Sequence, residues 1–310
     1  MDINENIEHI VKSNVDLEKC LTNRDSKDNI TFGSGVKFSD PCIVGIDEAG
    51  RGPVLGPMVY GLCYYPLGKE SIFNDLGCAD SKTLTDEKRK DIFQKMCSDD
   101  VGWIVEALSP TFISNNMLLR SKYSLNQIAQ DSTVGLLNKI ISMGINIAEV
   151  YVDTVGPPEK YQDKLKSIFP EFKIVVAKKA DSLYPVVSAA SICAKVSRDT
   201  ALTTWVFTED FEVSLEEIGS GYPNDPVTKK FLKGNFDKIF GFPQLVRFSW
   251  STADKILEDE SFCTEWEDVE EGASEKTPNI LGFFKKDPRK KEHTKHEFFK
   301  KRKLMNTENL

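Results

Sequence analysis

The feature that most constrains the fold is the stretch 43–53, with the sequence IVGIDEAGRGP. An apolar run typical of a buried strand ends in two adjacent carboxylates, Asp47 and Glu48, and Gly-Arg-Gly follows. On a continuing strand the two acids would point to opposite faces of the sheet. Because glycine lets the backbone turn, we expect both acids to reach one site. The alternative interpretation is a strand that ends in a charged turn.

Strand-like and helix-like segments alternate along the rest of the chain. The segment 148–177 reads as strand, helix and strand, a pattern that requires parallel pairing. We therefore predict an α/β fold with a mixed five-stranded sheet flanked by helices, and a helical C-terminal region. The expected strands cover 42–47, 58–65, 103–108, 148–153 and 172–177.

Composition shifts suggest three regions. Residues 1–37 are polar and charged, and we expect a flexible N-terminal arm. Residues 38–257 contain the periodic apolar segments and form the predicted catalytic domain. Residues 258–310 are first acidic and then basic, which is typical of a solvated tail.

The residue inventory excludes several kinds of site. The three histidines, His9, His293 and His296, all lie in the predicted arm or tail, so a histidine-based triad or zinc site in the core is excluded. The seven cysteines form no Cys-x-x-Cys pair, which suits reduced thiols in the cytosol or nucleus. No apolar run is long enough for a membrane span, and the acidic N-terminus is unlike a secretory signal.

Carboxylates are therefore the candidates for catalysis. Asp47, Asp153 and Asp181 each follow a predicted strand, and Glu48 is adjacent to the first. In open α/β sheets, ligands bind at the carboxyl ends of strands. Clustered acids repel one another, and a pair of Mg²⁺ or Mn²⁺ ions, roughly 3.5–4 Å apart, would resolve this and support phosphodiester hydrolysis. The net charge of −8 is unlike a passive nucleic-acid binder but is compatible with such a centre. Taken singly, each aspartate is more often a cap or turn former.

Several short motifs occur in one characteristic order. They are DEAGRGP (47–53), DSK (80–82), VDTVG (152–156), KAD (179–181), SAAS (188–191) and GYP (221–223). Together they resemble type 2 ribonuclease H. The flanking PVLGPMVY (53–60), GFP (241–243) and RFSW (247–250) resemble the catalytic subunit of its eukaryotic heterotrimeric form. The resemblance covers about 42–257.

This resemblance implies a ribonuclease H fold and an endoribonuclease. Its expected substrates are RNA/DNA hybrids and duplex DNA with single embedded ribonucleotides, incised on the 5′ side. It implies that Asp47, Glu48, Asp153 and Asp181 bind the metal ions. Two alternatives remain: a metal-dependent nuclease of the same fold that acts on DNA, and a nucleic-acid-binding scaffold without turnover.

The resemblance also implies substrate contacts. Gly50, Arg51 and Gly52 would surround the ribonucleotide 2′-hydroxyl, the group that distinguishes RNA from DNA. Tyr222 would stack on the sugar of the following deoxynucleotide. Weaker candidates for phosphate contacts are Lys82, Asn126, Lys179, Lys195 and Arg198, since surface cations are usually only solvated.

The tail suggests partners. Residues 277–284 resemble a sliding-clamp peptide through Ile280, Phe283 and Phe284, although Thr277 stands where glutamine usually opens that motif. The alternative is an apolar tail segment that packs against a partner subunit or against nothing. The family resemblance implies two auxiliary subunits. The basic runs at 285–291 and 300–303 predict either a nuclear localisation signal, with the cytosol as a second compartment, or a tail that contacts DNA.

Overall fold

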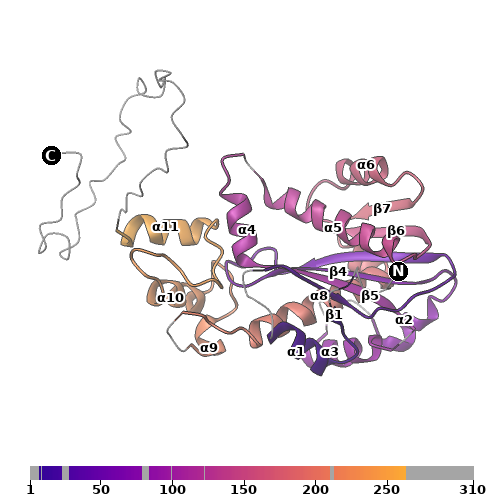
Figure 1. The fold of residues 1–310 in the computed structure, drawn as a ribbon, viewed down its shortest axis with the longest axis horizontal. Helices are drawn as coiled ribbons and strands as arrows, with labels where there is room; N and C mark the ends of the chain where they lie inside the picture. Colours follow the sequence, from indigo (N-terminus) through magenta and orange to yellow (C-terminus); the bar gives the residue numbers. More distant parts are fainter. Residues whose placement is uncertain are drawn as a thin grey trace, which may run out of the picture.

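A mixed sheet with helices on both faces forms the body of the molecule (Figure 1). The computed structural model describes residues 7, 9–22, 28–78, 84–98, 100–121, 123–209 and 213–262. The predicted α/β architecture is confirmed, but the sheet has seven strands, two more than we predicted. Within these described ranges, no helix combines the length and apolarity that crossing a membrane requires.

Strand direction varies across the sheet. In spatial order the strands are β1 (His9–Ile10), β2 (Ile30–Gly33), β5 (Gly102–Leu108), β4 (Met58–Pro66), β3 (Cys42–Ala49), β6 (Ile147–Asp153) and β7 (Lys173–Ala177). β3 pairs antiparallel with β4 and parallel with β6, and β6 pairs parallel with β7. The carboxyl ends of β3, β6 and β7 therefore lie at one edge of the sheet, as the strand–helix–strand pattern predicts.

Each sheet face carries its own hydrophobic core. On one face lie α1 (Asn14–Thr22), α2 (Ser71–Leu76), α3 (Asp86–Met96) and α8 (Pro185–Thr203). On the other lie α4 (Pro110–Met117), α5 (Leu125–Ser142) and α6 (Pro158–Ile168). Local signals begin these helices where expected: Thr85 caps α3, and Ser124 opens α5 with a capping box.

The N-terminal region corrects our domain boundary. We predicted a flexible arm up to residue 37, but β1, α1 and β2 belong to the folded body. Leu17, Leu21 and Phe32 are buried in the same core as α3 and α8. His9 lies in β1 and not in a tail, and β2, β5 and β4 separate it from β3.

Small residues let α8 approach the sheet closely. A Cβ on Gly61 of β4 would lie 2.3 Å from the Ala190 carbonyl oxygen, so only glycine fits there. Ser188, Ser191 and Ala194 of the same helix are fully buried. The predicted close packing of this small-residue face is confirmed. It places Ser191 beside the end of β3.

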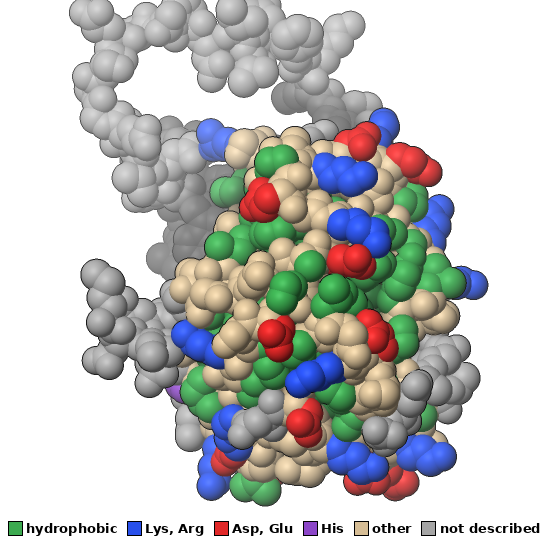
Figure 2. All heavy atoms as spheres, turned by 90° about the vertical axis from the view of Figure 1, so that its right-hand side faces the viewer, with side chains coloured by type: hydrophobic (Ala, Val, Ile, Leu, Met, Phe, Trp, Pro, Cys, Tyr) green, Lys and Arg blue, Asp and Glu red, His purple; other side chains and the backbone are tan. Residues whose placement is uncertain are grey.

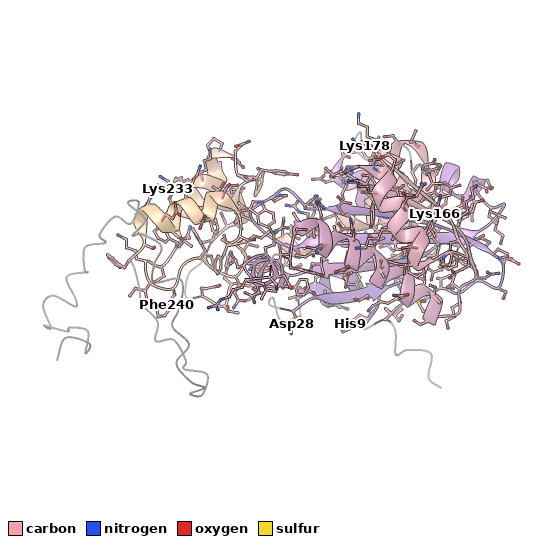
Figure 3. The ribbon with its side chains drawn as sticks, turned by 90° about the horizontal axis from the view of Figure 1, so that it is seen from above. His9, Asp28, Lys166, Lys178, Lys233 and Phe240 are labelled. Carbon is pink, nitrogen blue, oxygen red and sulfur yellow. The ribbon has the colours of Figure 1, made fainter. Side chains whose placement is uncertain are left out.

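A third core lies at one end of the molecule. It is formed by α9 (Leu215–Ile218), α10 (Pro226–Gly234) and α11 (Ser251–Glu260), together with Val54 and Leu55 from the loop after β3. Figure 3 shows Lys233 and Phe240 at this end and Lys166 and Lys178 at the other. The predicted tail from residue 263 onward, including the clamp-like peptide, lies outside the described residues.

Positive and negative side chains are interspersed on the face of the molecule drawn in Figure 2. On the face shown in Figure 2, Lys and Arg side chains alternate with Asp, Glu and hydrophobic side chains. This face therefore offers no single-sign surface for a nucleic-acid backbone.

Candidate active site

Asp47 and Glu48 both lie inside β3, which extends two residues beyond the predicted strand end at residue 47. The strand continues through Ala49, with Asp47 opposite Gly61 and Glu48 opposite Tyr60 on β4. Because side chains alternate, the two acids point to opposite sheet faces, and the turn does not bring them to one face. The interaction of Asp47 with Ser191 places it on the α8 side. Glu48 lines a pocket on the α5 side.

Asp47 is deeply buried, with 5% of its surface exposed. Its Oδ1 accepts the Glu48 backbone N–H at 2.7 Å. Burial, followed by the charges of Glu48 and Asp153, raises the pKa of Asp47 well above its ordinary value. Hydrogen bonds from Ser191 and the Glu48 N–H act in the opposite direction. A buried carboxylate with acidic neighbours lacks a compensating cation.

Glu48 is less buried than Asp47. Burial raises its pKa to about 7; the Arg51 guanidinium opposes this shift, and the Asp153 charge adds to it. Asp153 therefore acts on both acids of β3, from the end of the neighbouring parallel strand. These three carboxylates form one electrostatically coupled group.

Asp181 lies in the connection after β7, one residue beyond Ala180. Lys179 adopts the left-handed backbone conformation at φ 57° and begins the short helix α7 (Ala180–Leu183). This conformation is uncommon for a residue with a side chain. Asp153 Oδ1 accepts the Ala180 N–H at 2.7 Å, which ties the end of β6 to α7. Asp181, the next residue, is 3% exposed.

The donor set suits a hard divalent cation in chemistry and charge. All four acids offer carboxylate oxygens, which Mg²⁺ and Mn²⁺ prefer. Burial, followed by the charges of neighbouring carboxylates, raises the pKa values of Asp47 and Glu48, and a bound cation would oppose both effects. Among the described residues, however, no three His, Cys, Asp or Glu side chains are close enough to enclose an ion. The set is therefore open, with Asp47 and Glu48 on opposite faces of β3.

The Gly-Arg-Gly turn begins where β3 ends. Gly50 has φ +78°, the region that favours glycine, and a Cβ there would lie 2.7 Å from the Pro57 carbonyl oxygen. Arg51 extends toward α5, where its guanidinium donates a hydrogen bond to the Asn126 side-chain oxygen. The structure thus brings Arg51 and Asn126, two predicted substrate contacts, directly together.

Arg247 fixes the Gly-Arg-Gly turn through hydrogen bonds to its backbone. Sequence analysis did not predict this role. Arg247 is fully buried, and its guanidinium donates to the carbonyl oxygens of Gly56 at 2.8 Å, Arg51 at 3.2 Å and Gly50 at 2.6 Å. Trp250 adds a bond from its Nε1 to the Gly52 carbonyl oxygen at 3.0 Å. Burial, and then nearby Arg198, lower the pKa of Arg247 to about 9. An arginine inside the apolar run LVRFSW was the signal available in the sequence.

Tyr222 lies beside the turn on a braced loop. A Cβ on Gly52 would be 3.2 Å from the Tyr222 ring, and 52% of Tyr222 is exposed. Asp225 fixes the loop because it accepts hydrogen bonds from the Ser220 hydroxyl and N–H, both at 2.7 Å. These bonds lower the pKa of Asp225 to about 2. An exposed aromatic ring on a hydrogen-bonded loop is available for stacking.

The remaining predicted contacts divide into three cases. Arg198 on α8 lies against Gly50, and its Nε and Nη2 have no hydrogen-bond partner in the described part of the chain. Lys179 is exposed beside Asp181, and Lys195 lies on α8. Lys82 falls outside the described residues.

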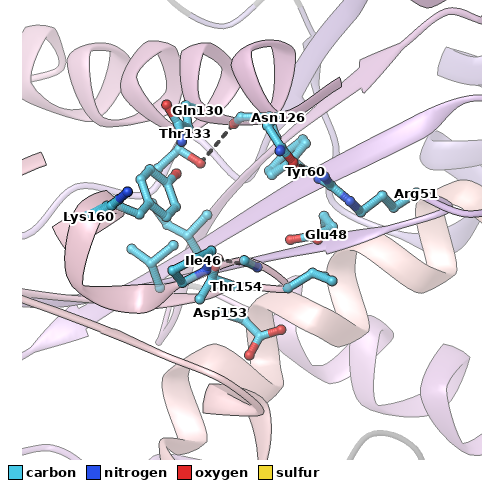
Figure 4. Close-up of a pocket in the computed structure, with 16 residues that line it drawn as sticks. Ile46, Glu48, Arg51, Tyr60, Asn126, Gln130, Thr133, Asp153, Thr154 and Lys160 are labelled. Atoms are coloured by element: carbon cyan, nitrogen blue, oxygen red, sulfur yellow. Dashed lines mark hydrogen bonds between the residues drawn. The ribbon is translucent and has the colours of Figure 1, made fainter. Parts of the chain in front are cut away.

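A pocket of about 210 Å³ opens beside Glu48 and Asp153. It lies between α5, α6 and the carboxyl ends of β3 and β6 (Figure 4). Arg51 and Lys160 stand on opposite sides of it (Figure 4). Sequence analysis gave no indication of this pocket, because its lining comes from elements far apart in the chain.

Comparison with known proteins agrees with this geometry. A family model described as Ribonuclease HII matches residues 44–253. The chain is 49% identical over 271 residues to the A subunit of ribonuclease H2 from Bos taurus, covering 87% of this chain and 91% of the relative. The crystal structure of ribonuclease H2 from Pyrococcus horikoshii OT3 is 35% identical, with a TM-score of 0.58 over 70% of this chain and 97% of that one. A chain in the structure of the PCNA:RNase HII complex from Archaeoglobus fulgidus is 30% identical, with a TM-score of 0.51. The match covers 62% of this chain and 85% of that one.

Proposed function

This chain belongs to the ribonuclease HII family, and from that premise we propose that it is the catalytic subunit of a ribonuclease H2. It is an endoribonuclease that hydrolyses the RNA strand of RNA/DNA hybrids. It also incises duplex DNA on the 5′ side of single embedded ribonucleotides. The observation that carries this conclusion is the coupled acid group at the ends of β3 and β6, beside the Gly-Arg-Gly turn.

Asp47, Glu48, Asp153 and Asp181 are the residues that would hold divalent cations, Mg²⁺ or Mn²⁺, two to a site. When bound, such ions activate a water molecule and stabilise the leaving oxygen of a phosphodiester. Hydrogen bonds from Ser191 and the Glu48 N–H favour the ionised form of Asp47, the form that binds a cation. Asp153 is oriented by the Ala180 N–H.

The Gly-Arg-Gly turn and the side chains around it select the substrate. Arg51, held by Asn126, presents a guanidinium to a phosphate near the acids. The backbone of Gly50 and Gly52 can approach a ribose closely because neither residue has a side chain. Tyr222 stacks on the sugar that follows the ribonucleotide. Arg198 is a weaker candidate for a second phosphate, because its Nε and Nη2 are buried and its Nη1 bonds to Asp199.

The two rival functions predict different behaviour. A nuclease of this fold that acts on DNA has no need for a glycine-lined contact with a 2′-hydroxyl. A scaffold without turnover has no need for buried, mutually repelling acids, whose burial costs free energy. A glycine turn at Gly50 and a buried acid with acidic neighbours at Asp47 are present, and they support the ribonuclease over these two rivals.

The test of the proposal is incision of a duplex that carries one ribonucleotide. With Mg²⁺, the complex of the full chain and its subunits should cut on the 5′ side of that ribonucleotide and leave all-DNA duplex intact. Tyr222→Ala should reduce kcat/KM on this substrate by about tenfold or more, since base or sugar stacking is worth roughly 1–3 kcal/mol. Cleavage inside a continuous RNA/DNA hybrid should fall less, because ribose is present on both sides there.

The decisive quantity is the ratio of kcat/KM on the two substrates. Tyr222→Phe, which keeps the ring, is the matched control and should retain the ratio of the natural chain. An unchanged ratio in Tyr222→Ala would mean that the ring supports the loop and does not read the junction. Incision of all-DNA duplex at a comparable rate would replace the proposed function with the DNA-nuclease alternative.

We also propose partners for the region beyond the described domain. The Bos taurus relative carries a subunit letter in its name, and such a name implies further subunits. We expect two auxiliary subunits, and a sliding clamp that binds Ile280, Phe283 and Phe284. The archaeal relative bound to PCNA supports the clamp. The basic runs of the tail support nuclear localisation.

Truncation after Phe262 separates these proposals. This residue ends the described part of the chain, and its N–H bonds to the Lys238 carbonyl oxygen at 2.8 Å, so the cut spares the folded body. We expect the shortened chain to lose nuclear accumulation and clamp binding, and to assemble poorly with its subunits. Gel filtration, clamp pull-down and localisation of a fluorescent fusion measure the three properties. Normal assembly would show that the tail is not the subunit-binding surface.

A further inference from the structure

The pocket beside the acids contains a polar group that the catalytic roles above do not use. Tyr60 on β4 is 3% exposed and lines this pocket. Its hydroxyl makes no hydrogen bond to any residue that the structure describes. The hydroxyl of Tyr161, also in the lining, is already bonded to Thr133. The Tyr60 oxygen is not among the side-chain atoms that are both sealed from solvent and unpaired, so its hydroxyl is open to the pocket, where a ligand can bond to it.

Arg51 lines the pocket, whereas Tyr222 is not part of the lining. Tyr222 lies against Gly52, the residue that follows Arg51. The Arg51 guanidinium bonds to Asn126 at the start of α5. From Asn126 the lining follows α5 as far as Thr133, about 10 Å at a rise of 1.5 Å per residue.

This arrangement gives the bound strand a direction. With Tyr222 on the sugar that follows the ribonucleotide, the acids face the phosphate that precedes it. The pocket then lies on the side of the upstream nucleotide. Its lining suits a sugar–phosphate unit: hydroxyl and amide groups inside, with Arg51 and Lys160 on opposite sides for phosphates (Figure 4).

We propose that this pocket is a subsite for the ribose immediately upstream of the scissile phosphate, and that the Tyr60 hydroxyl pairs with its 2′-hydroxyl. The inference rests on the proposed function. It follows that the enzyme distinguishes two consecutive ribonucleotides from a single one, because a deoxyribose upstream leaves Tyr60 unpaired.

The experiment compares cleavage of one bond in two duplexes of the same sequence. The upstream sugar is ribose in one duplex and deoxyribose in the other, and the ratio of kcat/KM is measured for the assembled enzyme. Tyr60→Phe removes one oxygen and keeps the ring. It should reduce the preference for upstream ribose by a factor between about two and ten, the range for one neutral hydrogen bond. An upstream 2′-fluoro sugar, which lacks the hydroxyl donor, should behave like deoxyribose in the natural enzyme.

Tyr65→Phe provides the matched control. Tyr65 is on the same strand and 4% exposed, but pairs with Ile43 at the far end of β3. It should keep the natural preference. An unchanged preference in Tyr60→Phe, or an equal loss on both duplexes, would overturn the subsite. Failure of the natural enzyme to cut either duplex would instead overturn the proposed function and the subsite with it.

Discussion

Replacing Asp47 with Asn lowers kcat with Mg²⁺ by at least about a hundredfold, the scale of one lost electrostatic contact to the transition state. The change removes a negative charge from the metal-binding acids and adds almost no volume. The fold should survive, because the asparagine oxygen can still accept the Glu48 N–H. Stability without metal should stay equal or rise, since burial and the charges of Glu48 and Asp153 oppose the ionised carboxyl.

Loss of rate with unchanged or higher Tm is thus the signature of a metal-binding acid. Single-turnover kinetics and thermal unfolding in EDTA measure the two quantities, and calorimetry should show weaker Mn²⁺ binding. Asp163→Asn, at an exposed position on α6, is the control and should change neither. A kcat of Asp47→Asn close to that of the unmutated enzyme would contradict the assignment of two metal ions to these acids.

Arg247→Met should impair both stability and activity. Methionine fills much of the volume but leaves the Gly50, Arg51 and Gly56 carbonyl oxygens without their donor. Unsatisfied buried acceptors cost roughly 1–3 kcal/mol each, and part of this is recovered where water reaches them. We expect the free energy of unfolding to fall by about 2–4 kcal/mol. We also expect kcat/KM on the one-ribonucleotide duplex to fall at least about tenfold, because small displacements of a positioning group are costly.

Two further variants separate positioning from general destabilisation. Arg247→Lys keeps the charge but cannot reach three carbonyl oxygens at once, so its rate should lie between those of the natural enzyme and Arg247→Met. Trp250→Phe removes the bond to the Gly52 carbonyl oxygen and leaves a smaller ring beside the Arg247 guanidinium, and it should have a smaller effect. If Arg247→Met, measured below its Tm, cleaves the one-ribonucleotide duplex with the kcat/KM of the unmutated enzyme, then Arg247 stabilises the fold and does not position the turn for catalysis.

The sequence by itself determined the elements with local signals. β3, β4, β5, β6 and β7 coincide closely with the apolar runs, since buried strands require them. Thr85 begins α3 through a hydrogen bond to a residue in its own first turn. The acids at the strand ends were found for the same reason, because strand position and residue type are both local properties. The metal and substrate roles assigned to them remain predictions.

Features that depend on long-range contacts could be seen only in the tertiary structure. β2 becomes a strand because it pairs with β5, some 70 residues away, and its own polar surroundings do not indicate this. The opposite facing of Asp47 and Glu48 depends on how far β3 remains paired with β4. Arg247 reaches the Gly50 carbonyl oxygen across 197 positions of the chain, and the Tyr60 pocket combines residues of three strands and two helices. Sequence periodicity reports only neighbours within a few residues, so packing alone could fix these features.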